Sequence, residues 1–210
     1  MLLKDKVAII TGSASGFGKE TALLFAKEGA KLVLVDYNPS GEEVAEEINN
    51  SGGQAIFVKA DVSCDKDVEK FINLAVETFY KVDILFNNAG IYIPGKAHEL
   101  DVNDWDRVVD INLKSVYLGS KYAVPHMKEN GGVIINTASA GGIIGFPDAV
   151  SYAASKGGVV SLTKAMAVDY AQYNIRVNCI CPGTGATGMT KEILEDKQLS
   201  EMFLAPIPLK

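Results

Sequence analysis

The sequence has few cysteines and histidines, and their scarcity excludes several classes of protein. Among its 210 residues are two histidines and three cysteines, namely Cys64, Cys179 and Cys181. Three cysteines cannot all pair, so a disulfide-dense secreted scaffold is excluded, and reduced thiols in a cytoplasmic protein are expected. Cys179 and Cys181 share one predicted strand, where inert buried thiols are expected. The two histidines lack a constellation of further ligands, so no metal site is predicted.

Long apolar runs and an excess of positive charge are also missing. No apolar run approaches the length of a membrane span, and Lys4, Asp5 and Lys6 interrupt the stretch that would form a signal peptide. Lysine and arginine total 20 against 26 aspartates and glutamates, which gives a net charge of −6. Nucleic-acid binding usually leaves a basic surface, so the expected partner is a small molecule, with neither nucleic acid nor membrane.

The composition is that of an average globular protein, with 48% hydrophobic and 22% charged residues. Disordered, collagen-like and coiled-coil chains are thereby excluded, and the length predicts one domain over residues 1–210. Short β-branched runs alternate with helical stretches along the whole chain. Strands are predicted at 6–11, 31–36, 54–61, 82–88, 132–139 and 175–182, and helices near 16–28, 40–50, 65–80, 104–128 and 151–173.

The predicted strands are continuous apolar runs, which is typical of a parallel sheet covered by helices on both faces. Alternation of strands and helices with right-handed crossovers predicts an α/β fold, a doubly wound parallel sheet of the Rossmann type in three layers. Asp65 is expected to cap the third helix, and Gly29 is expected to end the first. Ligands of such folds bind beyond the carboxyl ends of the strands, so we expect the functional residues there.

A glycine-rich turn, Thr11-Gly12-Ser13-Ala14-Ser15-Gly16-Phe17-Gly18, ends the first strand directly before a helix. Glycines permit a tight turn and a close approach of the backbone to a pyrophosphate, and the helix N-terminus supplies free N–H groups. Such a turn alone is weak evidence, but its place in the first strand–helix unit favours a nucleotide site. The predicted cofactor contacts from this turn are Gly12, Ser15, Gly16, Phe17 and Gly18.

Asp36 ends the second strand, 18 residues after Gly18. A carboxylate at this place accepts hydrogen bonds from both ribose hydroxyls and repels a 2′-phosphate. Neither Ser15 nor Tyr37 offers a compensating cation, so NAD is predicted in preference to NADP.

The next two strand ends supply further candidate contacts to the cofactor. Asp61 and Val62 end the third strand, where they are placed to flank an adenine, and Asn87-Asn88-Ala89-Gly90 ends the fourth. Asn88 and Gly90 are predicted cofactor contacts. Because Asn side chains also tie neighbouring strand ends together, that structural role stays open beside the binding role.

Three Tyr-x-x-x-Lys matches occur, and their context has to choose among them. Tyr92–Lys96 contains Pro94 and Gly95 and is expected to be a loop, while Tyr117–Lys121 lies inside a long helix away from any strand end. Tyr152–Lys156 opens a helix just after the fifth strand, and its i,i+4 spacing puts both side chains on one face. The fifth strand delivers Ser139 to the same edge of the sheet.

Removal of a hydride from an alcohol requires a base for the hydroxyl proton. A free phenol has a pKa of about 10, so forming the phenolate at pH 7 costs about 4 kcal/mol. The ammonium of Lys156, together with an oxidised nicotinamide, stabilises the charged form and lowers that cost. A hydrogen bond from Ser139 to the reacting oxygen stabilises the charge that develops there. These residue types fit hydride transfer with Tyr152 as general acid and base.

The chain resembles the classical short-chain dehydrogenase/reductase family from residue 3 to residue 210. The ordered set of matches is specific, although no single piece is: Thr11-Gly12-x3-Gly16-x-Gly18, Asp36, Asp61, Asn87-Asn88-Ala89-Gly90, Asn112, Ser139, Tyr152-x3-Lys156 and Pro182-Gly183-x3-Thr187-x-Met189.

The resemblance implies roles for individual residues. Tyr152 is the implied general acid and base, Lys156 lowers its pKa and holds the nicotinamide ribose, and Ser139 orients the substrate. Asn112 anchors a proton-relay water. Pro182, Gly183 and Thr187 lie near the nicotinamide carboxamide by the same comparison, as does Gly185, where many relatives carry an apolar residue.

The resemblance also bears on assembly and on the end of the chain. It implies a homotetramer or homodimer built on the predicted helices 104–128 and 151–173, the second of which carries Val159, Val160, Leu162 and Met166 besides its core face. Family members usually continue through another helix and a seventh strand. We therefore expect the 210 residues to lack this last helix and strand and to be part of a longer product, since the strand 175–182 would otherwise remain an apolar edge.

Three functions are compatible with a nucleotide-binding α/β chain, and the four candidate catalytic residues discriminate among them. The favoured function is an NAD-dependent oxidoreductase of secondary alcohols or ketones. A sensing module that binds NAD without turnover, or a methyltransferase, needs no set like Asn112, Ser139, Tyr152 and Lys156. The segment 140–147 carries no charged anchor, so a small neutral substrate is expected. Reduction of a 3-oxoacyl carrier protein is the alternative, and the acidic balance and Asp36 fit it poorly.

Overall fold

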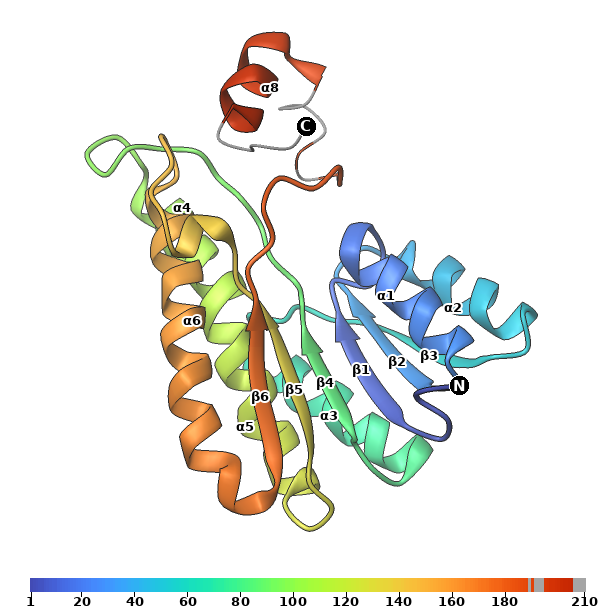
Figure 1. Ribbon diagram of the computed structural model, residues 1–210. Coiled ribbons are helices and arrows are strands. Elements are labelled where there is room, and N and C mark those ends of the chain that lie inside the picture. Colours follow the sequence, from blue (N-terminus) through green and yellow to red (C-terminus); the bar gives the residue numbers. More distant parts are fainter. Residues whose placement is uncertain (189, 191–194, 206–210) are drawn as a thin grey trace.

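The computed structural model describes residues 1–188, 190 and 195–205. Its centre is a parallel sheet in which the described strands follow the order β3-β2-β1-β4-β5-β6 (Figure 1). The strands are β1 Val7–Thr11, β2 Lys31–Asp36, β3 Gln54–Lys59, β4 Ile84–Asn87, β5 Gly132–Thr137 and β6 Ile175–Ile180. The order reverses between β1 and β4, and such a switch point leaves a crevice at the carboxyl ends of the strands.

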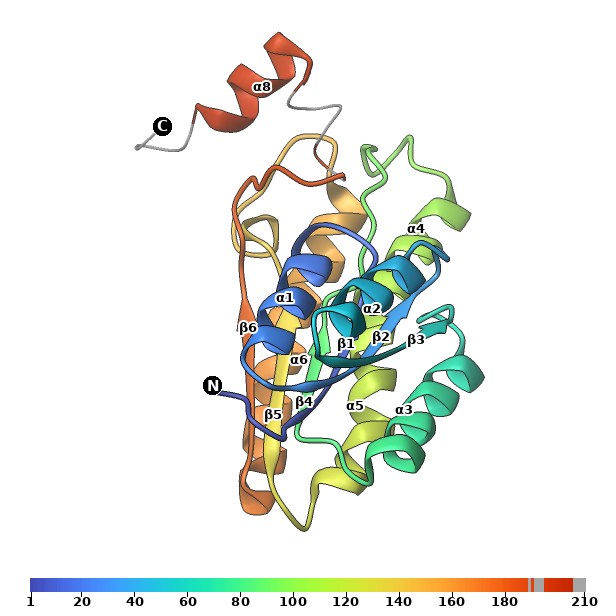
Figure 2. The same cartoon turned by 90° about the vertical axis from the view of Figure 1, so that its right-hand side faces the viewer.

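Helices cover both faces of this sheet, as Figures 1 and 2 show. On one side lie α1 Gly16–Lys27 and α2 Gly41–Asn50, and on the other lie α3 Asp65–Phe79, α5 Ser115–Met127 and α6 Val150–Tyr170. The remaining described helices are α4 Val102–Val109, α8 Lys197–Leu204 and the short turns η1 Asp110–Lys114, η2 Ala140–Gly142 and η3 Ala171–Tyr173. The predicted doubly wound, three-layered fold is confirmed.

Two apolar cores form because successive side chains of a strand point to opposite faces. In β1, Ile9 packs with the α3, α5 and α6 side, whereas Ala8 and Ile10 pack with the α1 and α2 side. All three are fully buried. Burial on both faces explains why β1 and β2 have continuous apolar sequences instead of alternating ones.

The strand β6 departs from that pattern. Its Ile175 and Val177 are buried in the core, whereas Arg176, Asn178 and Ile180 are exposed on the opposite face. Among the described strands β6 is at an edge of the sheet, as expected, and α1 and α2 lie over the other half of the sheet (Figure 1).

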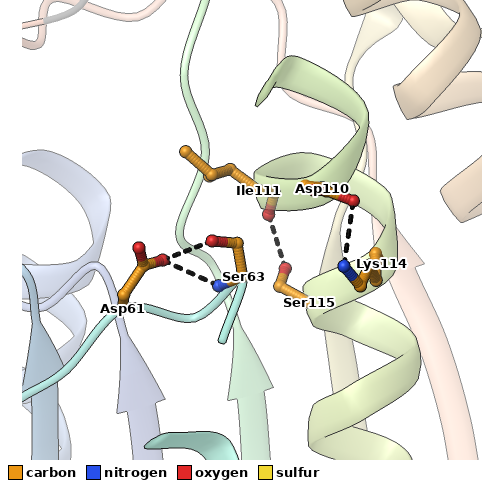
Figure 3. Close-up of polar contacts among 6 residues, drawn as sticks. All are labelled: Asp61, Ser63, Asp110, Ile111, Lys114 and Ser115. Carbon is orange, nitrogen blue, oxygen red and sulfur yellow. Dashed lines mark hydrogen bonds and ion pairs between the residues drawn. The ribbon is translucent and has the colours of Figure 1, made fainter. Parts of the chain in front are cut away.

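The predicted helix 104–128 is in fact three helical segments. Asp101 caps α4 by accepting from the Asn103 N–H at 2.8 Å, and the π-helical turn η1 then separates α4 from α5. In a π-helical turn the carbonyls lose their usual i+4 partners, and the Ser115 hydroxyl donates to the Ile111 carbonyl (Figure 3). The same turn carries a Lys114–Asp110 ion pair and, buried within it, Asn112.

The ends of the first and third helices were predicted in part. Gly29 follows α1 with φ +88°, so it ends the helix as expected. The expectation that Asp65 caps α3 is wrong, because Cys64 is the cap residue and Asp65 is the first helical residue. The helix α8 was not predicted. Met189, the last residue of the final sequence motif, lies outside the described residues. The same holds for residues 206–210, at the chain end.

None of the described helices combines the length and the hydropathy that crossing a membrane requires.

Candidate functional site

A cleft of about 530 Å³ runs along the carboxyl edge of the sheet, where the six strands end. It collects candidates from every strand end. The predicted residues that line it are Gly12, Ser15, Gly16, Phe17, Asp36, Asp61, Val62, Asn88, Gly90, Ser139, Tyr152, Lys156, Pro182, Gly183, Gly185 and Thr187. Gly18 and Asn112 do not line the cleft, and both support residues that do.

The glycine-rich turn has the backbone geometry that a phosphate site needs. Gly12 and Gly16 have φ of +68° and +52°, which residues with a Cβ adopt only with strain. A Cβ on Gly18 would collide with the Gly12 carbonyl, so a glycine at position 18 allows α1 to pack closely against the turn. The Ser15 side chain forms no capping hydrogen bond to α1, and the first-turn N–H groups have no intrahelical acceptor. The start of α1 therefore offers free donors to the cleft.

Two carboxylates at the ends of β2 and β3 are held by short backbone hydrogen bonds. Asp36 accepts from the N–H of Ala14 at 2.9 Å and of Asn38 at 2.8 Å. In Asp61, one oxygen accepts from both the N–H and the hydroxyl of Ser63, at 2.9 and 2.6 Å (Figure 3). A carboxylate has about four acceptor positions, so each keeps capacity for a ligand.

A cation that the sequence analysis missed lies beside Asp36. Lys59 is opposite Asp36 in the β2–β3 register, and its Nζ is 5.8 Å from the centre of the Tyr37 ring. Tyr37 itself lines the cleft and is exposed. Only the pairing of β2 with β3 reveals this proximity, because the two residues are 23 positions apart and Lys59 belongs to no motif.

The asparagines at the end of β4 tie neighbouring strand ends together. Asn87 donates to the Asn136 side chain at 2.9 Å, and Asn88 donates to the Thr11 carbonyl at 3.0 Å and accepts from the Thr137 hydroxyl at 3.3 Å. This is the structural role that the sequence left open. Asn88 also lines the cleft, so its position allows contact with a ligand as well.

Ser139, Tyr152 and Lys156 meet at this edge of the sheet, beyond the end of β5. Tyr152 is in the first turn of α6, and its half-buried phenol is hydrogen-bonded with Ser139, which follows β5. Burial raises the pKa of Tyr152 above its ordinary value, and the Ser139 hydrogen bond opposes that shift. The Ser139 oxygen also accepts from the Gly141 N–H at 3.1 Å, so its hydroxyl proton serves as the donor to the phenol.

Lys156 is a buried cation one helical turn after Tyr152. Its side chain is almost completely enclosed, with an exposed fraction of 3%, and burial lowers the pKa of its ammonium to about 8. Nζ donates to the Thr137 carbonyl at 2.6 Å and lies 5.9 Å from the centre of the Tyr152 ring. The i,i+4 spacing thus places the amine beneath the phenol, as predicted.

Asn112 is fully buried and connects three parts of the site. Its Oδ1 accepts from the Ile91 N–H at 2.8 Å, while Nδ2 donates to the Ile91 carbonyl at 2.9 Å and to the Ser155 hydroxyl at 3.2 Å. A Cβ on Gly90 would lie 3.2 Å from Asn112 Oδ1 and 3.3 Å from Lys156 Nζ, so a glycine lets the loop after β4 approach both. Asn112 therefore holds this loop against α6.

The loop after β6 crosses over the start of α1. The Pro182 carbonyl accepts from the Ala140 N–H at 2.9 Å, and a Cβ on Gly185 would lie 2.7 Å from the Phe17 ring. A side chain at position 185 would therefore displace the Phe17 ring. Phe17 and the loop both line the cleft.

A second, smaller cavity of about 100 Å³ adjoins Ser139 and Tyr152. Its described walls carry no charged side chain and consist of Tyr92, Ser139, Ala140, Phe146, Ala149, Tyr152, Pro182, Gly183, Thr184 and Thr190. The sequence predicts that Tyr92 lies in a loop and that its Tyr-x-x-x-Lys match has no catalytic role. The loop assignment holds, and the tyrosine nevertheless reaches the site.

The cysteines and histidines form no centre of their own. No group of metal-ligating side chains assembles within the described part of the chain. Cys179 and Cys181 are neighbours and only partly buried, in contrast to the expected full burial, and burial with the adjacent thiol raises the pKa of Cys181. A raised thiol pKa lowers the thiolate fraction and hence the reactivity.

Comparisons with known proteins give a consistent result. Residues 6–198 match the family model described as short chain dehydrogenase. The trans-4-hydroxycyclohexanecarboxylate dehydrogenase of Sinomonas cyclohexanicum is 43% identical over 89% of this chain and 74% of its own length.

Two solved structures are similar in fold as well as in sequence. Levodione reductase superposes with a TM-score of 0.91 at 38% identity, covering 96% of this chain and 83% of its own. The 3-ketoacyl-(acyl-carrier-protein) reductase from Brucella melitensis, complexed with NADH, superposes with a TM-score of 0.85 at 43% identity. The match covers 90% of this chain and 80% of the reductase chain.

Proposed function

Because the chain belongs to the short-chain dehydrogenase family, we propose that it is an NAD(H)-dependent oxidoreductase that interconverts a secondary alcohol and its ketone. The observation that carries this proposal is the meeting of Ser139, Tyr152 and Lys156 at one point of a cleft that also contains a glycine-rich helix start. A sensing module that binds NAD without turnover has no use for a lysine buried beneath a tyrosine.

The residues of the cleft fit a nicotinamide dinucleotide. The free N–H groups at the start of α1 suit a pyrophosphate, and the anchored carboxylate of Asp36 has acceptor positions left for ribose hydroxyls. Asp61 and Val62 line the cleft nearby and would flank the adenine, while Pro182, Gly183, Gly185 and Thr187 would lie near the carboxamide. The bound cofactor supplies the acceptor or the donor of the hydride.

The chain's own residues move the proton. Tyr152 Oη takes the hydroxyl proton of the alcohol in oxidation and returns it to the ketone oxygen in reduction. Lys156 stabilises the phenolate through its charge, since an ammonium near a phenol favours the ionised form. With substrate bound, Ser139 donates its hydroxyl proton to the substrate oxygen and so orients it. Asn112 holds the loop after β4 in place, and we keep for it the relay-water role that the resemblance implies.

We further propose a small substrate without a strong charge. The cavity beside Ser139 and Tyr152 is lined by apolar and hydroxyl side chains among the described residues, and a dianion such as a sugar phosphate would need a lysine or arginine there. The relative from Sinomonas cyclohexanicum is named for a hydroxylated cyclohexanecarboxylate, so cyclic alcohols with and without a carboxylate belong among the first compounds to test.

A second candidate substrate class is a 3-oxoacyl thioester. The likeness to the reductase from Brucella melitensis favours it, whereas the net charge of −6 opposes docking of an acidic carrier protein.

The experiment that tests the function follows nicotinamide absorbance with a panel of secondary alcohols, cyclic ketones and an acetoacetyl thioester, each with both cofactors. Turnover of a neutral alcohol or ketone supports the proposal, and preference for the thioester supports the second candidate. Tight NADH binding without turnover of any compound would leave only the sensing module.

Cofactor choice is expected to depend on Asp36. The unmodified protein should prefer NAD over NADP by at least about tenfold in kcat/KM, which corresponds to about 1.4 kcal/mol. The variant Asp36→Ala should lose most of this preference, because the carboxylate no longer repels the 2′-phosphate and Lys59 is left beside it.

The double variant Asp36→Ala/Lys59→Gln is the matched control for that result. It should show a smaller gain in NADP use than Asp36→Ala, since the repulsion by the carboxylate is still removed but the cation is missing. Equal use of both cofactors by the unmodified protein would overturn the assignment to NAD.

We propose a homodimer or homotetramer that uses the exposed faces of α5 and α6. Of the four α6 residues that suggested free apolar surface, Val159 and Met166 are buried in the chain's own core and provide none. Val168 and Tyr117 remain 79% and 51% exposed. Light scattering at micromolar concentration should give at least a dimer, and Val168→Asp should shift the mass toward the monomer. A monomeric unmodified protein contradicts this assignment.

A further inference from the structure

Tyr92 lies against the proposed proton-transfer residue, although it comes from a different loop. Its ring is 5.4 Å from the Tyr152 ring, centre to centre, with an interplanar angle of 89°. This is the edge-to-face arrangement that aromatic pairs prefer, and such a contact stabilises the pair beyond simple burial. Tyr92 is half-buried and, with Tyr152 and Ser139, lines the small apolar cavity.

The hydroxyl of Tyr92 is bonded to the turn that starts α6. It donates to the Asp148 carbonyl at 3.1 Å, and the same carbonyl accepts from the Gly95 N–H at 2.8 Å. Asp148 has a φ of +50°, an unfavourable conformation for a residue with a side chain. An isolated parallel bridge joins Gly95 to Ala149, the residue before α6. The loop that contains Tyr92 therefore holds a strained turn in place four residues before Tyr152.

We propose that Tyr92 is a positioning residue for Tyr152: its ring shields the Tyr152 phenol from water and fixes its orientation, and its hydroxyl holds the turn that begins α6. The inference rests on the proposed role of Tyr152 and goes beyond it, because no motif assigns Tyr92 a part in the reaction. Ring and hydroxyl act on different atoms, so two substitutions separate them.

The surroundings of Tyr152 contain few groups that titrate. Among the described residues, Lys156 faces it from its own helix, Ser139 from the loop after β5 and Tyr92 from the loop after β4, with Asp148 beyond Tyr92. Burial is the main cause of the raised pKa of Tyr152. Burial also raises the pKa of Tyr92, and the charge of Asp148 and the Tyr152 phenol add to that shift. Removing the Tyr92 ring admits water to the Tyr152 phenol and should therefore lower its pKa.

The direct test measures the ionisation of Tyr152 and needs no substrate. Protein labelled with 13C at the tyrosine Cζ is titrated by NMR, and the Tyr152 signal is identified by its loss in Tyr152→Phe. In Tyr92→Leu the Tyr152 pKa should fall by at least about half a unit, because an apolar side chain without the ring leaves the phenol more hydrated. In Tyr92→Phe, which keeps the ring, it should stay close to the wild-type value.

Kinetic and binding measurements complete the test. Tyr92→Leu should lower kcat by about tenfold and shift the pH profile of kcat in the same direction as the Tyr152 pKa, with an unchanged NADH dissociation constant. Tyr92→Phe should lower kcat by a smaller factor and without that shift. An unchanged Tyr152 pKa in Tyr92→Leu overturns the proposal, whether or not the protein turns over a substrate. If the wild-type protein is inactive but the Tyr152 pKa still falls in Tyr92→Leu, the proposed function alone is contradicted.

Discussion

Replacement of Tyr152 by phenylalanine should abolish the proton transfer while leaving the fold and the cofactor site intact. The variant lacks only the Oη atom, which accepts the substrate proton in the proposed reaction, and turnover should fall by at least about a hundredfold, the low end for general acid–base catalysis. The ring stays in place against Tyr92, so packing in the first turn of α6 is kept. The measurement is kcat with the best alcohol, together with the NADH dissociation constant from fluorescence.

The matched control is Tyr117→Phe. Tyr117 also belongs to a Tyr-x-x-x-Lys sequence, but it is half exposed on α5 and does not line the cleft. This variant should keep turnover within about twofold of wild type, as expected for a surface substitution without a catalytic role. Equal losses in the two variants would show that the wrong tyrosine was chosen.

Replacement of Lys156 by methionine should remove activity without destabilising the protein. The methionine occupies the same buried position but cannot stabilise a phenolate, so kcat should fall by about a hundredfold. The free energy of unfolding at pH 7 should be unchanged or higher. Burial lowers the Lys156 pKa from 10.5 to about 8, which corresponds to about 3 kcal/mol of unfavourable burial for the ammonium. Removal of this burial cost stabilises the variant, and loss of the hydrogen bond to the Thr137 carbonyl offsets about 1–3 kcal/mol of that stabilisation.

The dependence on pH follows from the same pKa values. Between about pH 8 and pH 10.5 the unfolded chain binds a proton at Lys156 that the folded protein has released. Stability linked to this group therefore rises with pH across that window, and the full cost of burial applies below pH 8. The stability advantage of Lys156→Met over wild type should be largest at pH 7 and should shrink toward pH 10. Denaturant unfolding of both proteins at each pH measures this difference.

Lys164→Met is the control on the same helix. Lys164 is exposed on α6, so this substitution should change neither activity nor the pH dependence of stability. If Lys156→Met instead lost 2 kcal/mol or more at pH 7, the burial cost assigned to the ammonium would be wrong.

Much of the fold follows from local sequence alone. Burial on both faces makes β1 and β2 continuous apolar runs, and Gly29 is needed where the chain leaves α1 with a positive φ. The π-helical turn around Asn112 could not be predicted, because its apolar spacing resembles that of an ordinary helix. What distinguishes it are hydrogen bonds of Asn112 to Ile91 and Ser155, which come from distant parts of the chain.

The candidate site was predictable where a residue belongs to a motif at a strand end. Asp36 and Ser139 are of this kind, and Tyr152 belongs to a motif at the start of the helix that follows β5, so the fold brings all three to one edge of the sheet. Lys59 and Tyr92 were missed because their positions depend on strand register and on a loop that folds back onto α6. Neither relation leaves a periodic or spaced pattern in the sequence.

The central claim is that this cleft transfers a hydride between a substrate carbon and a nicotinamide while Tyr152 handles the proton. Its most direct test uses the best alcohol of the panel, deuterated at the carbon that bears the hydroxyl, with NAD and the unmodified protein. The account predicts that the NADH formed contains one deuterium by mass spectrometry, and that Tyr152→Phe forms it at least about a hundredfold more slowly. NADH without deuterium, or an equal rate in the variant, would contradict it.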